Sequence, residues 1–221
     1  MINCLFMMKP HKYFFFLILA LNACFCLSGQ AKNKVDIFDL TFDDNFKLPA
    51  ISKAIVAQRV QEFQNNQAIT LIKNNLEVEL TRNGEVIIVT IPADELFAPN
   101  DTTLLNKSKD ILSKFLKFTK SPGMYKVLLV MHSDNTGTHE YAQKLTSARV
   151  NSVYEWFDAN GGTKTVVPYA FGEIQPLQNN DSMEKRRLNR RLEIYIVPDE
   201  EMINQAKNGK VTGVTISNKR K

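Results

Sequence analysis

Cysteine is nearly absent from this sequence, and its three cysteines, Cys4, Cys24 and Cys26, all lie near the amino terminus. The long segment that follows can form neither a disulfide framework nor a zinc site built on thiolates. Its fold must therefore be held by a hydrophobic core alone. About 190 residues follow position 31, which is enough for one domain with an appendage.

Strong charge bias and phosphate-binding loops are also missing. The formal net charge is only +5, and basic residues gather only at 185–191 and 219–221. Nucleic-acid binding has no further support, and an export signal argues against it. No glycine-rich phosphate loop appears among the nine glycines.

Residues that could carry catalysis do not fall into a productive pattern. His132, Ser133 and Asp134 are consecutive, so on an extended strand their side chains cannot converge as a catalytic triad. His132, Asp134 and His139 could ligate a metal in principle, but no fourth ligand is evident. We therefore expect a protein that is not an enzyme, without cofactor or metal.

The amino terminus has the organisation of an export signal over residues 1–31. Lys9, His11 and Lys12 precede an apolar run at 14–27, which is shorter than the roughly 20 residues that span a membrane. A cleaved signal peptide is the better interpretation, with cleavage favoured after Ala31. The alternative is a lipoprotein box at residues 21–24 that would make Cys24 the lipidated first residue, although Asn22 is unusual there.

The remaining chain divides into three parts. Residues 32–75 contain a polar lead-in and an amphipathic helix at about 51–72, which either packs on the following domain or presents a partner surface over 49–72. Residues 76–198 alternate strands and helices, beginning with a hairpin whose two-residue turn is Asn83-Gly84. Thr102 or Thr103 is the expected cap of the next helix. Residues 199–221 are expected to be a weakly structured polar tail.

The expected elements of the domain share the order of an α/β protein. Strands are expected at 76–80, 86–91, 125–130, 166–171 and 192–196, and helices at 104–116, from Gly137 to about 158, and in the basic segment near 185. This pattern predicts a two-layer βαβαβ-type sandwich, with a mixed sheet covered by helices on one face and an N-terminal helix in front.

Asp134 and Arg149 are the candidate ligand-binding charges. Asp134 lies where a strand gives way to a helix, a position with free N–H groups, although it could simply be a turn residue. Arg149 is four residues from both Leu145 and Val153, so helical spacing puts it on the inward face. The pair could be an internal salt bridge, or it could bind a zwitterion through its ammonium and its carboxylate.

Four ordered motifs resemble one protein family over about residues 78–197. Residues 131–137, Met-His-Ser-Asp-Asn-Thr-Gly, are similar to G-H-T-D-x-x-G, and residues 141–150 are similar to Y-N-x-x-L-S-x-R-A-x-x-V. Gly172-Glu173 with Pro176 and Asn179 resembles G-E-x-x-P-x-x-N, and residues 189–194 resemble N-R-R-V-E-I. The segment thus resembles the OmpA C-terminal-like domain family, which includes the peptidoglycan-associated lipoproteins.

The resemblance implies a ligand and a set of residues. The family binds the peptidoglycan stem peptide, usually through meso-diaminopimelate, and its ammonium-binding aspartate and carboxylate-binding arginine match Asp134 and Arg149. Thr136 and Gly137 complete the expected binding turn, whereas Asn189 and Arg191 match positions that shape the cleft or touch the wall. Because side chains alternate along a strand, Arg190 is expected on the opposite face.

Several positions depart from the family pattern. Met131 and Ser133 are mild replacements of glycine and threonine, and Lys185 replaces a glycine. Ala98 and Ala142 stand where many members carry aspartate and asparagine, so two auxiliary polar groups are missing. The resemblance implies that the two principal charges remain.

The expected function is anchoring of the outer membrane or an envelope complex to peptidoglycan, by an exported protein of the periplasm associated with the outer membrane. The alternative is a protein–protein module of an envelope complex that works through the 49–72 helix and binds the wall weakly or not at all. A flagellar stator component is disfavoured, since no retained membrane helix with an acidic proton site is evident.

Overall fold

The structure is a computed structural model that describes residues 47–162 and 164–211. All described residues belong to one compact unit of the chain. The expected signal peptide, the lipoprotein box at Cys24, most of the polar lead-in and the end of the tail lie outside the described residues. Among the described helices, none has the length and apolar character needed to cross a membrane.

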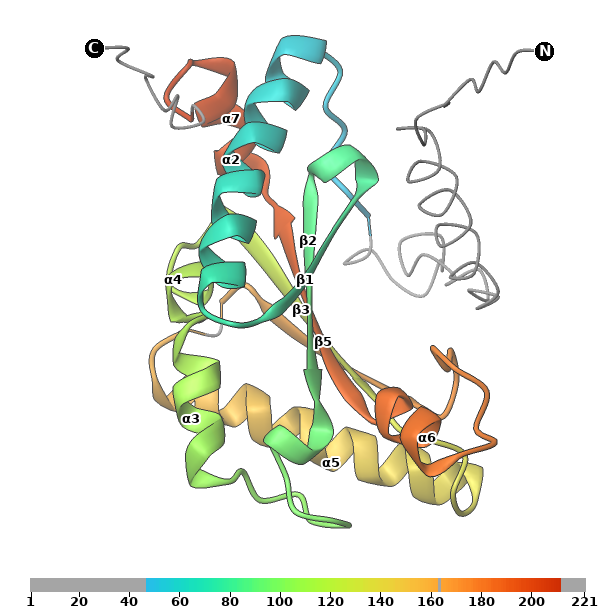
Figure 1. Cartoon of the computed structure of the whole chain (residues 1–221). Helices are drawn as coiled ribbons and strands as arrows, with labels where there is room; N and C mark the ends of the chain where they lie inside the picture. The colour runs from blue at the N-terminus through green and yellow to red at the C-terminus, as the bar shows by residue number, and fades with distance from the viewer. Residues whose placement is uncertain (1–46, 163, 212–221) are drawn as a thin grey trace, which may run out of the picture. The chain divides into compact units, whose positions relative to one another are not determined.

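A five-stranded mixed sheet forms the centre of the domain (Figure 1). Its order is β1-β2-β5-β3-β4, and every neighbouring pair is antiparallel except the parallel pair β3–β4. The strands are β1 (Glu77–Thr81), β2 (Val86–Pro92), β3 (Tyr125–His132), β4 (Val166–Gly172) and β5 (Arg191–Pro198). The last strand inserts between β2 and β3, so residues distant in sequence meet at its two ends.

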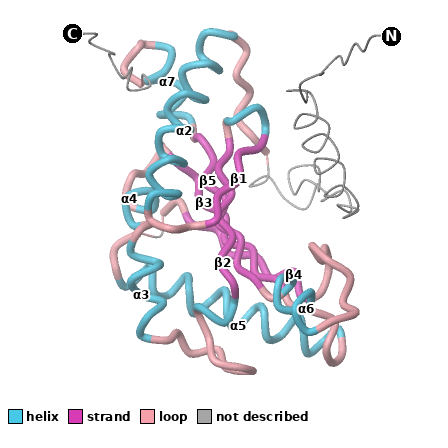
Figure 2. The backbone as a smooth tube through the Cα atoms, viewed as in Figure 1, coloured by secondary structure: helices cyan, strands magenta, loops and turns pink. Residues whose placement is uncertain are grey.

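Helices pack on one face of this sheet, as Figure 2 shows for the long elements. They are α2 (Ala54–Lys73), α3 (Asn106–Ser113), α4 (Leu116–Thr119), α5 (His139–Ala159) and α7 (Glu200–Lys207), whereas the short helix α6 (Met183–Asn189) contributes no residue to the main core and leads into β5. The main core joins apolar residues of β2, β3 and β5 to Val60 of α2, Phe157 of α5 and Met202 of α7. Each fully buried side chain of this size stabilises the fold by roughly 1.5–3 kcal/mol.

The second face of the sheet is apolar as well. Val86, Leu128, Val130 and Tyr195 form a second buried cluster, and Leu48 packs against it. Burial on both faces explains why β3 and β5 are nearly continuous apolar runs in the sequence rather than alternating strands.

The predicted fold class is confirmed, whereas the predicted two-residue turn between β1 and β2 is wrong. The last paired residues are Thr81 and Val86, which leaves four residues in the connection, and Arg82 joins Asn83 in left-handed backbone conformation. The carboxamide of Gln64 in α2 donates a 2.9 Å hydrogen bond to the carbonyl of Glu85. This contact with α2 outweighs the local preference of Asn-Gly for a tighter turn.

Two local expectations about helices are also wrong. Helix α3 begins at Asn106 with Leu105 in the capping position, so neither Thr102 nor Thr103 caps it. Residues 200–207 form α7 instead of a weakly structured tail. In α2, Ile55 and Ile69 are exposed, and the buried face is Val56, Val60, Gln64, Ala68 and Leu71.

Candidate ligand-binding site

The candidate site lies at the carboxyl end of β3, where the chain turns into α5. Asp134 accepts a 2.9 Å hydrogen bond from the backbone N–H of Thr136, which fixes its carboxylate in the turn. Gly137 has φ of +99°, a conformation that side chains disfavour, and Thr138 then caps α5 by accepting from Tyr141 N–H at 3.2 Å. The sequence around the predicted helix start therefore builds a rigid frame for Asp134.

Arg149 lies on the buried face of α5, as helical spacing predicts. Its Nε donates to the carbonyl of Asp101 at 2.8 Å, and its Nη2 donates to the carbonyl of Ala98 at 3.1 Å. The guanidinium carbon lies 5.0 Å from the centre of the Phe97 ring. These neutral partners position Arg149, while no carboxylate among the described residues forms an ion pair with it, so its positive charge remains available to an anion.

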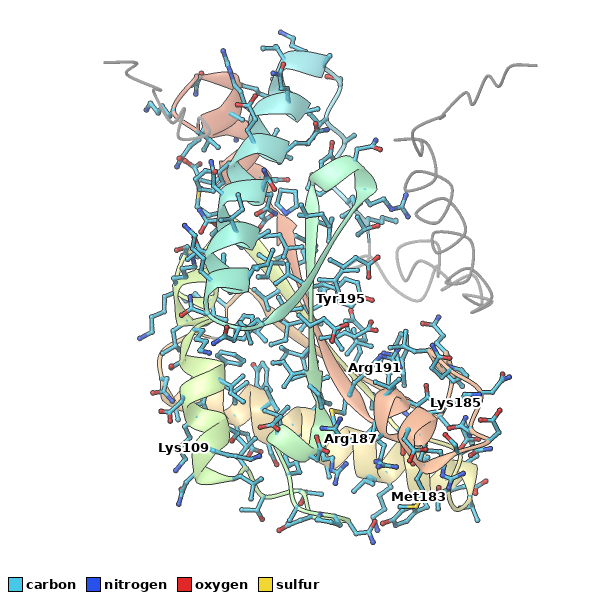
Figure 3. All side chains as sticks on the ribbon, viewed as in Figure 1. Lys109, Met183, Lys185, Arg187, Arg191 and Tyr195 are labelled. Atoms are coloured by element: carbon cyan, nitrogen blue, oxygen red, sulfur yellow. The ribbon has the colours of Figure 1, made fainter. Side chains whose placement is uncertain are left out.

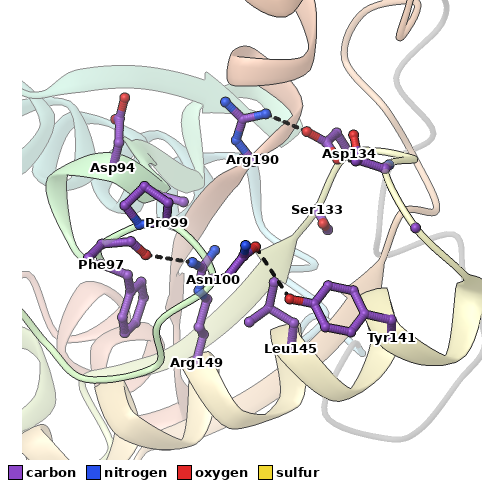
Figure 4. Close-up of a pocket in the computed structure, with 14 residues that line it drawn as sticks. Asp94, Phe97, Pro99, Asn100, Ser133, Asp134, Tyr141, Leu145, Arg149 and Arg190 are labelled. Carbon is purple, nitrogen blue, oxygen red and sulfur yellow. Dashed lines mark hydrogen bonds and ion pairs between the residues drawn. The ribbon is translucent and has the colours of Figure 1, made fainter.

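Asp134 is paired with Arg190 and not with Arg149 (Figure 4). The alternative of an internal Asp134–Arg149 salt bridge does not describe this structure. The prediction that Arg190 points to the opposite face is wrong, because Arg190 is the residue that ends α6, with ψ of 93°, and β5 begins only at Arg191. Alternation along the strand therefore does not fix the direction of the Arg190 side chain.

These charges line one cavity of about 480 Å³, a volume typical of small-ligand sites. Three segments supply most of its wall: the loop after β2 at 93–100, the turn at 133–137, and the side of α5 that carries Tyr141, Leu145 and Arg149. Arg190, between α6 and β5, completes the wall (Figure 4). The predicted residues Asp134, Thr136, Gly137 and Arg149 are thus brought together.

Both principal charges remain ionised at neutral pH. Burial, the largest single influence, would raise the pKa of the Asp134 carboxyl, but the Thr136 N–H and the Arg190 guanidinium together hold that pKa below its ordinary value. Burial lowers the pKa of Arg149, and the nearby charge of Arg190 lowers it further. Since an arginine starts far above neutrality, Arg149 keeps its charge.

Two predicted ligand-binding residues do not line the cavity. Asn189 is fully buried, and its amide bonds the backbone of Gln178 and the side chain of Asn180. Arg191 is also buried and pairs with Glu193 at 2.8 Å. In the structure, both side chains hold the loop before α6 and the start of β5, so their contribution to the cavity is through its frame.

The two departures at alanine positions have different consequences. Ala98 lines the cavity, and its backbone carbonyl anchors Arg149. Ala142 is buried and is not part of the cavity wall. The alanine at position 98 therefore leaves space beside Arg149. The alanine at position 142 affects only the buried face of α5 and not the cavity wall.

Several residues of the cavity wall were not among the predicted ligand-binding residues, including Arg190, Tyr141 and Asn100. Arg190 belongs to the N-R-R motif, and Tyr141 belongs to the motif that contains Arg149, so proximity in the family motifs was the available signal. Tyr141 is 45% exposed, and its hydroxyl donates to Asn100 Oδ1 at 3.3 Å across the cavity mouth. Asn100 gives no sequence signal of its own, since only the folded loop brings it there.

Metal-binding geometry is absent from the described part of the chain, where no three His, Cys, Asp or Glu side chains converge. His139 lies 3.6 Å from Glu173, and His132 lies 3.7 Å from the buried Glu193. The two histidines thus have separate carboxylate neighbours, and neither lines the cavity.

Comparison with known proteins agrees with this architecture. Residues 96–190 match the family model of the OmpA family. The chain is 26% identical over 122 residues to the probable lipoprotein YiaD of Escherichia coli, covering 55% of this chain and 56% of that protein. It is 27% identical over 110 residues to outer membrane protein A of Bordetella avium, covering 49% and 57%. The chain thus spans just over half the length of these two relatives.

Solved structures give the same result for the fold. The cell wall anchor of the T6SS from Pseudomonas aeruginosa is similar with a TM-score of 0.53 and 27% identity, covering 63% of this chain and 99% of that one. A putative MotB like protein from Desulfovibrio vulgaris shares the fold with a TM-score of 0.53 at 19% identity, covering 65% and 94%. The predicted resemblance to the OmpA family is confirmed over residues 96–190.

Proposed function

We propose that this domain binds peptidoglycan without catalysis and anchors an outer-membrane or envelope component to the cell wall. The observation that carries the proposal is a single cavity in which Asp134 and Arg149 are both present and not paired with each other. The OmpA-like fold and the likeness to a cell wall anchor support it. The location that follows is the cell envelope, on its periplasmic side.

The ligand chemistry follows from the two charges. A carboxylate fixed by Thr136 N–H suits an ammonium group, and a guanidinium whose Nε and Nη2 are already oriented by carbonyls suits a carboxylate. An amino-acid end that carries both groups would bridge the cavity. In peptidoglycan, the diaminopimelate of the stem peptide has such an end, and we propose it as the ligand.

The sharpest test is Asp134→Asn in a sedimentation assay with purified sacculi. Asparagine keeps an oxygen for the Thr136 N–H but removes the charge, so the turn should stay intact. A hydrogen bond to a charged group contributes roughly 1.5–3 kcal/mol, so binding should weaken about ten- to a hundredfold. Wild-type sedimentation by this variant would refute the assignment of Asp134.

Asp94→Asn is the matched control. Asp94 also lines the cavity, but its carboxylate is half exposed and pairs with Arg187 at 2.6 Å. Exposed ion pairs contribute little, so this variant should bind sacculi like the wild type. Equal losses in Asp94→Asn and Asp134→Asn would point to a general charge effect.

Arg149 needs a conservative change because it also holds the 98–101 loop. Arg149→Ala would leave the carbonyls of Ala98 and Asp101 without their donors and would disturb the loop as well as the ligand. Arg149→Lys keeps the charge but loses the two-pronged geometry. We expect weaker sacculus binding with a circular dichroism spectrum like that of the wild type.

The protein–protein alternative has one specific observation in its favour. Helix α2 leaves Ile55, Ile69 and Ile72 exposed at 53%, 41% and 53%. If this surface binds an envelope partner while the cavity binds the wall, Ile69→Ser should leave sacculus binding unchanged. If the module has lost wall binding, the wild type itself should not sediment with sacculi.

A further inference from the structure

The ligand-free cavity already contains a competitor for Asp134. The Arg190 guanidinium occupies one oxygen of the Asp134 carboxylate, and the Thr136 N–H occupies the other. An incoming ammonium must therefore share or replace the contact with Arg190. Ligand choice in this cavity therefore depends on the position that the Arg190 side chain takes when a ligand binds.

Arg190 is built to move its side chain while its backbone stays in place. Its N–H donates to the carbonyl of Arg186 at 3.1 Å, and its carbonyl accepts from Ala93 N–H at 2.9 Å. Its side chain is 40% exposed, whereas that of Asp134 is 5% exposed. Because Arg190 is partly solvated, its guanidinium can return to water, provided that a ligand ammonium takes its place at the buried Asp134 carboxylate.

Arg149 differs from Arg190 in this respect. It is buried, and two loop carbonyls and the Phe97 ring hold its guanidinium. The cavity thus combines one buried guanidinium that is held by the loop with one partly exposed guanidinium, and they are close enough for the charge of Arg190 to lower the pKa of Arg149.

The ionised side chains of the cavity wall indicate which charged groups the ligand must carry. The ionised side chains of the cavity wall are Asp94, Asp134, Arg149 and Arg190, and Asp94 is already paired with Arg187 outside the wall. When a ligand ammonium takes Asp134, both arginines lack a carboxylate. A ligand with one ammonium and two carboxylates would pair all of these charges, whereas one with a single carboxylate leaves Arg190 unpaired.

We propose that Arg190 is a specificity-determining residue that pairs with Asp134 in the free protein and exchanges onto a second ligand carboxylate when an ammonium arrives. This inference rests on the proposed binding of diaminopimelate stem peptides. It selects stem peptides that end at diaminopimelate with both carboxylates free, over peptides in which one of these carboxylates is an amide.

Two synthetic peptides test the exchange by isothermal titration calorimetry on the full chain. One is L-alanyl-γ-D-glutamyl-meso-diaminopimelate with both diaminopimelate carboxylates free, and the other has the carboxylate of the L-centre converted to an amide. We expect the wild type to prefer the first by about tenfold in Kd. In Arg190→Gln the preference should disappear, and the amidated peptide should bind at least as tightly as to the wild type, since the competitor for Asp134 is gone.

Lys185→Gln is the control on the same helix. Lys185 is exposed, pairs with Asp181 and lies outside the cavity wall, so the tenfold preference should persist. Arg190→Lys, which retains a cation on a flexible side chain, should restore part of the preference and shows that a loss in Arg190→Gln is not a folding defect.

The outcomes separate the two proposals. A wild type that binds both peptides equally, or an Arg190→Gln variant that keeps the preference or weakens both peptides by the same factor, overturns the role of Arg190 and leaves the proposed function standing. A wild type that binds neither peptide overturns the proposed ligand and the role of Arg190 with it.

Discussion

At the scale of single residues, the most unusual side chains outside the cavity are charged groups on the second face of the sheet. Glu193 is fully buried and accepts from Arg191 Nε at 2.8 Å and from Tyr195 Oη at 2.5 Å. His132 Nε2 lies 3.7 Å from the same carboxylate, and its Nδ1 lies 3.3 Å from the carbonyl of Ile174. Figure 3 shows Arg191 and Tyr195 along β5. Arg191 satisfies Glu193, so His132 is not needed as a charged partner.

This arrangement predicts a stability that falls with acidity. Burial lowers the pKa of His132 below 6.5, and the nearby charge of Arg191 acts in the same direction, against the Glu193 carboxylate. Below about pH 6.5 the unfolded chain binds a proton that the folded domain resists, so the free energy of unfolding decreases by up to about 1.4 kcal/mol per pH unit. Urea unfolding at pH 7.5 and 5.5 measures this slope.

The matched pair of variants is His132→Gln and His139→Gln. The slope between pH 7.5 and 5.5 should flatten in His132→Gln, because the residue that resists protonation is gone. It should stay unchanged in His139→Gln, since the His139 side chain is 60% exposed. An identical slope in the wild type and His132→Gln would show that the dependence arises elsewhere.

At the scale of elements, the sequence predicts the sheet well because both of its strong signals are local. A run of β-branched residues marks β2, a continuous apolar run marks β3, and helical periodicity marks α5 and its buried Arg149. Contacts between residues that are far apart in sequence are not predicted by these local signals. The carboxamide of Gln64 donates to Glu85 O and Ile196 O, so this polar residue is buried on the inner face of α2. It interrupts the apolar pattern that would otherwise mark that face in the sequence.

The candidate site likewise contains residues that local signals predict and one residue, Arg190, that they do not. Asp134, Thr136 and Gly137 are adjacent in one turn, and Arg149 follows from helical spacing, so the sequence and the family motifs place them together. Arg190 reaches Asp134 only because β5 pairs with β3 at His132 and Arg191. A pairing between segments almost sixty residues apart leaves no periodic pattern, so strand alternation alone predicts the wrong direction.

Helix α7 was missed although its ends carry ordinary signals. Asp199 accepts from Glu200 N–H at 2.8 Å at the start, and Lys207 lies in the last turn. Its apolar residues are too few to show a period, and only packing on α2 reveals their role. Arg59 of α2 donates to the carbonyl of Ala206 at 2.7 Å, which fastens the end of α7.

The packing of α7 predicts that it stabilises the domain. Met202 is fully buried in the main core, so Met202→Ala should lower the free energy of unfolding by about 2–5 kcal/mol. Asn204→Ala, on the exposed side of the same helix, should change it by less than about 0.5 kcal/mol. Urea denaturation measures the free energy of unfolding of both variants. Equal values for the two variants would mean that the packing of α7 does not stabilise the domain.

At the scale of the whole molecule, the ligand cavity and the exposed isoleucines of α2 lie in different parts of the domain. In Figure 1, α2 and α7 lie at one end, and α6 with the turn before α5 lies at the other. The ligand cavity belongs to the second end, and the exposed isoleucines of α2 extend toward the first. Under the proposed function, wall binding at the cavity leaves the exposed surface of α2 open to a partner.

The proposed anchoring also requires an attachment to the membrane or to such a partner, and the processing of the expected export signal would decide which. Cleavage after Ala31 would release a chain that starts at Lys32 and depends on a partner, whereas a lipidated Cys24 would attach the domain directly. We expect the start at Lys32, because Asn22 disfavours the lipoprotein box. Intact-mass measurement on the membrane and soluble fractions checks this, and Cys24→Ser should then change neither the cleavage site nor the fraction. A fatty-acylated Cys24, lost together with membrane association in Cys24→Ser, would make the protein its own tether.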